Sequence, residues 1–236
     1  MPLPPAPANR DTRERILDAA ESIFMANGYE GASMRQITGE AGANLAAGNY
    51  HFGGKEALFQ AVLSRRLQVL NQERLRVLDE LEAKAAGTPL KPSQIVDAFF
   101  GTLLRMGTEP GGATFLRLIG RTLTEPAEFI RTVLAEEYAD VLERYKQALF
   151  SALPEVPREE IVWRFHFMLG ATSYAIAGTD TLRLVTDWQT GAAHDDPARL
   201  LPRLMSFLLG GLRASLPDLP PTSPTAAELR GQRKSS

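Results

Sequence analysis

Apolar side chains recur at spacings of three and four residues along most of this chain, the spacing that gathers them on one face of an α-helix. No segment alternates apolar and polar residues as a half-buried strand does, and no β-hairpin turn pair separates two apolar runs. The sequence therefore predicts an all-α protein.

The 16 prolines divide this pattern into separate helices, because a proline inside a helix removes a hydrogen bond and clashes with the preceding turn. Four prolines lie in residues 1–10 and four in residues 217–236, so we expect both tails to be disordered. The others mostly fall between segments of helical periodicity. We expect helices over Thr12–Asn27, Ser33–Ala41, Asn44–His51, Lys55–Ala85, Ser93–Gly107, Ala113–Leu123, Ala127–Leu153, Arg158–Ala177 and Pro197–Ala214.

The composition argues against an enzyme. The 236 residues include no cysteine, which excludes disulfide scaffolds, thiolate nucleophiles and zinc sites built on cysteine. The three histidines, His51, His166 and His194, are scattered, and no standard catalytic motif is present. We expect no catalytic residues, no metal and no cofactor.

The formal net charge is −2, so any surface that binds nucleic acid must be local rather than spread over the whole molecule. No apolar segment has the form of a signal peptide or of a membrane span. We therefore expect a cytoplasmic protein without a membrane partner.

Residues 33–52 have the spacing of a helix-turn-helix. Ser33 is a favourable N-cap for a first short helix, Gly42 permits a sharp turn, and a second short helix follows from Asn44. The inward-facing positions are expected to be Ile37, Ala41 and Phe52. A small helical bundle that binds no DNA also contains such a pattern and stays an alternative.

The second short helix carries polar and aromatic tips that can reach base edges or phosphates. The long helix after it begins at Lys55, directly after Gly53-Gly54, where exposed backbone N–H groups favour a phosphate. Tyr50 has two open interpretations, a DNA contact through its hydroxyl or a ring packed between the short helices. The predicted DNA-binding residues are Ser33, Arg35, Asn44, Leu45, Ala46, Ala47, Asn49, Tyr50, His51 and Lys55.

The stretch from Thr12 to Phe59 resembles the DNA-binding domain of the TetR family of transcriptional regulators. The matching positions are Ile-Leu-x-Ala-Ala from Ile16, Phe24, Gly28-Tyr29, Ser33, Ile37, Ala41-Gly42, Tyr50-x-Phe52 and Lys55-Glu56-Ala57-Leu58. The resemblance implies a homodimer in which each recognition helix reads one half-site of a palindromic operator. It also implies that a ligand bound in the C-terminal domain releases the DNA.

Three further stretches resemble the subgroup of this family typified by PsrA, a regulator responsive to long-chain fatty acids. They are Asn44–Ala47 with Asn49–Gly53, Trp163–Ala171, and Phe207–Ala214. The chain departs from this subgroup at Gly48, which usually is an apolar residue. Together with Gly39, Gly48 predicts a loosely formed reading head, by which we mean the two short helices that would contact DNA. Each glycine costs about 1 kcal/mol of helix propensity relative to alanine.

The segment Lys55–Ala85 contains 31 residues without glycine or proline, which as one helix would extend about 45 Å. One end holds the predicted phosphate contact and the other enters the larger domain. In a dimer, a rigid shift of this helix would change the distance between the two DNA-binding domains. Such a shift couples ligand binding to DNA binding only if the ligand binds one of the two helix positions better than the other.

The C-terminal half has aromatic and methionine side chains on neighbouring helices, which indicate either a bundle core or an apolar pocket. Arg117 and Arg121 share a helix face and suit the carboxylate or phosphate head group of a ligand, or pair with Glu125 or Glu128. The predicted ligand-binding residues are Phe99, Leu103, Met106, Phe115, Arg117, Leu118, Arg121, Phe165, Met168 and Thr172.

Small residues beside large apolar ones in the last two helices favour either close packing between two chains or an intramolecular core. The predicted dimer-interface residues are Phe167, Gly170, Ala171, Tyr174, Phe207, Leu208, Gly211 and Leu212. The domains expected are a helix-turn-helix DNA-binding domain over 11–54 and a helical ligand-binding and dimerisation domain over 55–216.

The function predicted is that of a ligand-responsive repressor. It would bind duplex DNA as a homodimer and be released by a small apolar effector such as a long-chain fatty acid or acyl-CoA. An α-helical enzyme and a purely structural bundle are the alternatives, and salt-dependent binding to duplex DNA separates the regulator from both.

Overall fold

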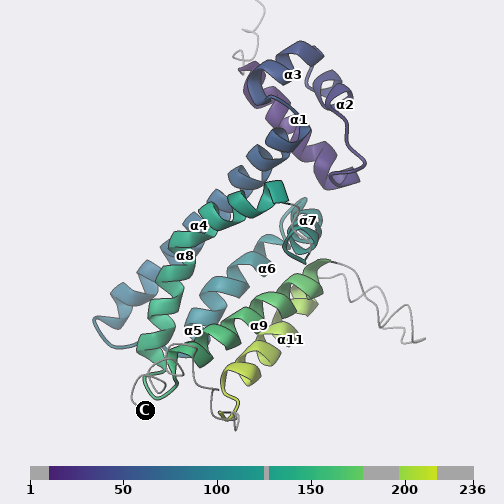
Figure 1. Ribbon diagram of the computed structural model, residues 1–236. Coiled ribbons are helices and arrows are strands. Elements are labelled where there is room, and N and C mark those ends of the chain that lie inside the picture. Colours follow the sequence, from purple (N-terminus) through teal and green to yellow (C-terminus); the bar gives the residue numbers. More distant parts are fainter. Residues whose placement is uncertain (1–10, 125–127, 178–196, 217–236) are drawn as a thin grey trace, which may run out of the picture.

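The computed structural model describes residues 11–124, 128–177 and 197–216, and every element in these ranges is a helix (Figure 1). The predicted all-α fold is therefore confirmed. The predicted tails 1–10 and 217–236 lie outside the described residues, as does Ala127, the expected first residue of one helix. The helices are α1 (Thr12–Asn27), α2 (Met34–Glu40), α3 (Leu45–Phe52), α4 (Lys55–Ala85), α5 (Pro92–Val96), the π-helix η1 (Asp97–Gly101), α6 (Thr102–Met106), α7 (Gly112–Thr124), α8 (Glu128–Ala152), α9 (Arg158–Ala177) and α11 (Pro197–Leu212).

Helices α1 to α3 form a small head at one end of α4, and the later helices form a larger body (Figure 1). α1 starts at the N-cap Asp11, whose side chain accepts a hydrogen bond from the backbone N–H of Arg13. It ends at Gly28, whose φ of 71° favours glycine. The buried face of α1 includes Phe24, whose ring centroid lies 4.9 Å from that of Phe59 on α4. The apolar face of α1 therefore packs on the first turns of α4, within the same core cluster that continues into the body.

The long helix α4 runs from the head into the body, where α8 lies alongside it (Figure 1). Its predicted bounds are confirmed residue for residue. Arg65 fastens α4 to α1, because its Nη1 donates to the Oδ1 of Asp18 at 2.7 Å and its Nη2 pairs with Glu21. Glu21 also pairs with Arg66. These ion pairs connect α1 of the head to α4.

A π-helical turn interrupts the segment that the sequence predicts as one helix over Ser93–Gly107. Within this turn the carbonyl of Phe99 accepts a 3.0 Å hydrogen bond from Nε of Arg74 on α4. The guanidinium of Arg74 is fully buried and lies 3.7 Å above the Phe99 ring. Tyr145 on α8 donates its hydroxyl to the carbonyl of Arg74 at 2.7 Å. The irregular turn thus belongs to a hydrogen-bonded network that joins three helices.

α9 packs against α7 on one side and α11 on another. Gly120 on α7 permits the close approach to α9, since a Cβ there would lie 2.4 Å from the backbone nitrogen of Ala177. Arg164 on α9 donates to the carbonyl of Leu212 at 2.7 Å and so satisfies the last turn of α11. No helix among the described residues is both long and apolar enough to cross a bilayer.

Candidate nucleic-acid interface

The turn between α2 and α3 is fixed by local hydrogen bonds. The Oγ of Ser33 accepts from the N–H of Gln36 at 3.2 Å, which caps α2, and the Oδ1 of Asn44 accepts from the N–H of Ala47 at 2.8 Å, which caps α3. Gly42 between them has a φ of 61°, a conformation that favours glycine. The sequence signals for the two short helices therefore produce the predicted helix-turn-helix geometry.

Gly48 on α3 faces α2 at close range. It is buried, and a Cβ at this position would lie 2.6 Å from Cγ2 of Thr38 and 3.1 Å from Cε of Met34. The expectation that Gly48 loosens the reading head is therefore wrong, because the missing side chain lets α3 pack directly on α2. Gly39, in contrast, is exposed and has open space around its Cα.

The outer face of α3 is open to solvent. Tyr50 is 85% exposed, which excludes the interpretation that its ring packs between the short helices. His51 is half-buried, with its ring centroid 5.2 Å from that of Tyr50 in an edge-on arrangement. Of the remaining residues predicted on α3 and its N-cap, Ala47 is half-buried and the exposed ones are Asn44, Leu45, Ala46 and Asn49.

Two cationic side chains border this face. Arg35 is exposed in the first turn of α2. Lys55 begins α4 after the N-cap Gly54, which provides no side-chain cap for the first N–H groups. The ammonium of Lys55 lies 4.2 Å from the centroid of the Tyr29 ring. Burial raises the pKa of Tyr29, with Glu56 and Glu30 adding to the effect, so its ring stays neutral.

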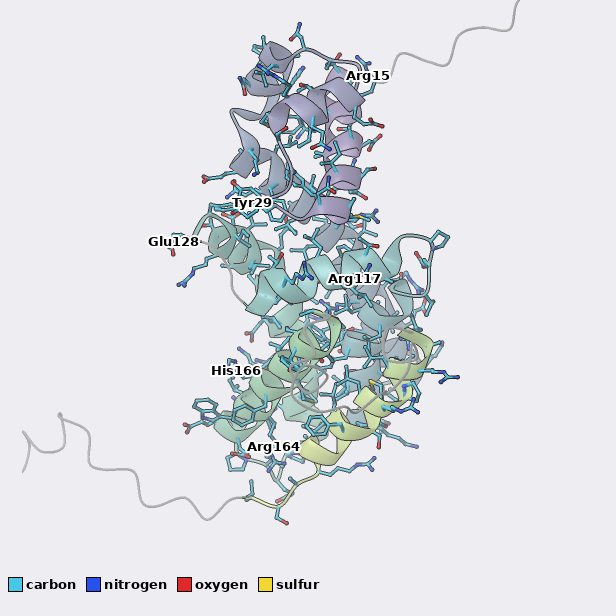
Figure 2. All side chains as sticks on the ribbon, turned by 90° about the vertical axis from the view of Figure 1, so that its right-hand side faces the viewer. Arg15, Tyr29, Arg117, Glu128, Arg164 and His166 are labelled. Carbon is cyan, nitrogen blue, oxygen red and sulfur yellow. The ribbon has the colours of Figure 1, made fainter. Side chains whose placement is uncertain are left out.

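Arg15 holds the helix-turn-helix to α1, a role that the sequence analysis missed. Its Nη1 donates to the carbonyl of Ala41 at the end of α2, at 2.9 Å. Arg13, near it on α1, lies with its guanidinium 5.2 Å from the Phe52 ring centroid. Arginine near the start of an amphipathic helix gives no signal of a long-range partner in the sequence, so only the folded head identifies both contacts. Figure 2 shows Arg15 at the end of the head farthest from the body.

The body contains two adjoining cavities between α8 and α9, of about 600 and 400 Å³. Their walls share Leu142, His166 and Leu169, so together they form one groove along the two helices. A third cavity, of about 750 Å³, lies between the end of α1 and the helices α7 and α8.

The residues predicted to bind ligand do not line a common cavity. Arg117, Leu118 and Arg121 line the third cavity, and Phe165 lines the α8–α9 groove. The members that lie in the buried core are Phe99, Leu103, Phe115, Met168 and Thr172, and Met106 is half-buried against it. This corrects the expectation of one pocket with the two arginines at its end, because α7 turns its arginine face toward the head.

Thr172 does have an unusual environment. Its Oγ1 is buried and has no hydrogen-bond partner among the described residues.

Among the described residues there is no group of three His, Asp or Glu side chains placed to hold a metal ion.

Comparison with known proteins assigns the family. A model described as "Bacterial regulatory proteins, tetR family" matches residues 16–62, and one described as "Tetracyclin repressor-like, C-terminal domain" matches residues 97–211. The two matches cover about two thirds of the chain. The chain belongs to the TetR family of transcriptional regulators.

Two curated relatives and one solved structure illustrate the similarity. The uncharacterized regulator TtgW of Pseudomonas putida is 44% identical over 57 residues, which are 24% of this chain and 42% of TtgW. The chain thus matches less than half the length of this curated relative. UidR of Escherichia coli (strain K12) is 27% identical over 87% of this chain and 91% of its own length. The fatty acid degradation regulator FadR from Bacillus halodurans shares the fold, with a TM-score of 0.55 and 15% identity over 90% of this chain and 100% of FadR.

In this TetR-family chain, the contacting helices α9 and α11 both carry large apolar side chains that are exposed to solvent. We define the α9/α11 patch by its large apolar side chains, each at least 47% exposed, which are Val162, Trp163, Phe167, Tyr174 and Phe207. Gly170 and Gly211 are also exposed, and Ala171 is half-buried. Leu208 and Leu212 are 1% and 2% exposed, so the structure corrects their prediction as interface residues and places them in the core of the monomer.

Proposed function

We propose that this protein is a homodimeric repressor that binds a palindromic DNA operator and is released by a small apolar effector. The observation that carries the proposal is the outer face of α3, where Tyr50 is 85% exposed on a short helix fixed by Gly48 against α2. A rigid helix with exposed polar tips suits the major groove. As a DNA-binding regulator, it would act in the cytoplasm and would not be an enzyme.

The roles of the head residues follow from their positions. The exposed tips of Asn44, Asn49 and Tyr50 face the bases, with Leu45, Ala46 and Ala47 lining the contact and His51 at its edge. Ser33, Arg35 and Lys55 lie at helix starts and meet phosphates. In this proposal residues 11–54 read DNA, and residues 55–216 bind the effector and form the dimer.

The α9/α11 patch supports the dimer. Large aromatic side chains at an exposed surface are typical of the centre of a protein interface. Two copies of the same patch would meet about a two-fold axis, the symmetry that a palindromic operator requires. The exposed Gly170 and Gly211 would permit close approach of the two chains.

The groove between α8 and α9 supports an apolar effector. Apolar side chains form most of its walls, and the polar groups along it include His166, Glu143 and Lys146. An elongated groove of this kind suits an acyl chain, and fatty acids and acyl-CoA thioesters are the first classes to test.

The test is selection of bound duplexes from a random pool, with and without long-chain acyl ligands. We expect a palindrome whose enrichment falls when ligand is added. Absence of any enriched site at low salt would contradict DNA binding, and a palindrome unaffected by ligand would contradict the effector class.

A matched pair of variants locates the reading face. Tyr50→Ala should weaken operator binding by about tenfold, since one side-chain contact to DNA contributes roughly 1 to 3 kcal/mol. Val69→Ala, at a 52% exposed position on α4 outside the head, should leave binding unchanged. Equal affinities of the two variants in a filter-binding titration would argue against α3 as the reader.

A further inference from the structure

The third cavity joins the two parts of the molecule. Its walls include Phe24, Tyr29 and Glu30 from the head, and Phe59 from α4. From the body come side chains of α7 and α8, which include Arg117, Leu118, Arg121 and Phe129. Figure 2 shows Tyr29 and Arg117 at the boundary between head and body. A molecule in this cavity would touch both parts at once.

The walls combine aromatic rings with positive charge. The ring centroid of Tyr29 lies 5.2 Å from that of Phe59 and 5.1 Å from that of Phe129. Arg117 is exposed, and its Nη2 donates to the Oγ1 of Thr114 at 3.3 Å.

Positive charge predominates on the cavity wall. Arg117 and Arg121 lie four residues apart on α7 and line the same space. Glu30 is the single carboxylate among the described residues that line the cavity, and since Arg121 takes part in an interaction of its own, the exposed Arg117 is the guanidinium that an anionic group would meet first. The cavity therefore suits an anionic group next to an apolar surface.

We propose that this junction cavity binds a small molecule with an anionic head group and an apolar body, and that its occupation weakens operator binding. The head group would pair with Arg117, with Arg121 adding positive charge from the next turn, and the body would lie against the half-buried rings of Tyr29 and Phe129. This site is separate from the α8–α9 groove, whose walls share no residue with it.

The link to DNA runs through Tyr29. This residue lines the cavity, and its ring lies under the ammonium of Lys55, the proposed phosphate contact. An anion held beside it adds negative charge near the start of α4, which opposes the approach of a phosphate. The ligand also fixes the head relative to α7 and so favours one of its orientations.

Binding is tested by calorimetry with three probes on the full chain, namely octanoate, octyl phosphate and octanol. We expect both anions to bind and octanol to bind at least tenfold more weakly, and the two anions distinguish a carboxylate from a phosphate head group. Arg117→Gln should weaken octanoate binding about tenfold or more, since it removes the charged hydrogen-bond donor that pairs with the head group.

The matched control is Arg131→Gln. Arg131 lies on α8 near the junction, pairs with Glu128 and does not line the cavity, so its loss removes the same charge from the same region. Unchanged octanoate affinity in Arg117→Gln, or an equal loss in both variants, would overturn the proposal.

The effect on DNA is measured with Leu118→Trp, which fills the cavity at a half-buried position of α7. This variant should bind operator without ligand and lose the response to octanoate. If octanoate binds the native chain in calorimetry but leaves operator affinity unchanged, the regulatory part is wrong. If no duplex binds at all, the proposed function fails, and the calorimetric comparison still decides whether the junction site exists.

Discussion

At the scale of single residues, two glycines in the head illustrate how position decides the role of a residue. Gly39 and Gly48 both lie inside short helices, where glycine costs about 1 kcal/mol relative to alanine. Only Gly48 faces another helix, and it brings α3 against Thr38. The lower helix propensity of Gly48 is therefore offset by packing. Nothing in the structure explains why a glycine occupies position 39.

The two alanine variants should behave in opposite ways. Gly39→Ala should raise the free energy of unfolding by up to about 1 kcal/mol, because its Cβ meets open space. Gly48→Ala should lower it by about 1 to 3 kcal/mol, because α2 and α3 must separate to admit the methyl group. Urea denaturation measures both, and a stabilised Gly48→Ala would show that the two helices separate at little cost.

At the scale of elements, α4, α8 and the π-helical turn are joined around the buried Arg74. Burial lowers the pKa of its guanidinium, while hydrogen bonds to Phe99 and Asn71 satisfy it. Tyr145 contributes from α8 through its bond to the Arg74 carbonyl, and burial raises the pKa of the Tyr145 hydroxyl. The network therefore needs a protonated phenol at position 145.

This requirement predicts a dependence of stability on alkaline pH. The raised pKa of Tyr145 means that its contribution is complete below about pH 10, the ordinary tyrosine value, and is lost as pH rises above it. Tyr145→Phe should cost about 1 kcal/mol at pH 7, since it removes one hydrogen bond. Above pH 10 the difference between variant and native chain should shrink in thermal unfolding, and a constant difference would contradict the assignment.

At the scale of the whole molecule, the head and the α9/α11 patch lie at different ends of the structure (Figure 1). In the proposed dimer the patch would set the distance between two heads, while α4 would transmit any shift between body and head. Half-sites about one helical turn apart or a multiple of it are the spacing that such an arrangement can read.

The patch predicts the outcome of a charge substitution. Phe207→Asp, at a 68% exposed position, should leave the monomer folded but weaken the dimer by about 2 kcal/mol or more, roughly thirtyfold. Light scattering at micromolar concentration measures the change, with Val69→Asp on α4 as the control for an exposed apolar residue outside the patch. A native chain that is already monomeric would contradict the dimer itself.

The sequence alone predicts the bounds of α1, α4 and α9, because each is a long periodic segment with clear start and stop signals. It does not predict the π-helical turn at Asp97–Gly101. Within that turn Phe99 bonds to Arg74, which lies 25 residues earlier in the chain, and no local pattern encodes such a contact.

The candidate site divides in the same way. The caps Ser33 and Asn44 are local signals, so the sequence by itself determined the helix-turn-helix. The same stretch of residues carries the resemblance to the DNA-binding domain of the TetR family. Periodicity places Arg117 and Arg121 on one face of a helix but does not say which neighbour that face meets. Only the tertiary structure directed them to the junction cavity and turned Leu208 inward beside the exposed Phe207, because the rotation of a packed helix is set by all its neighbours at once.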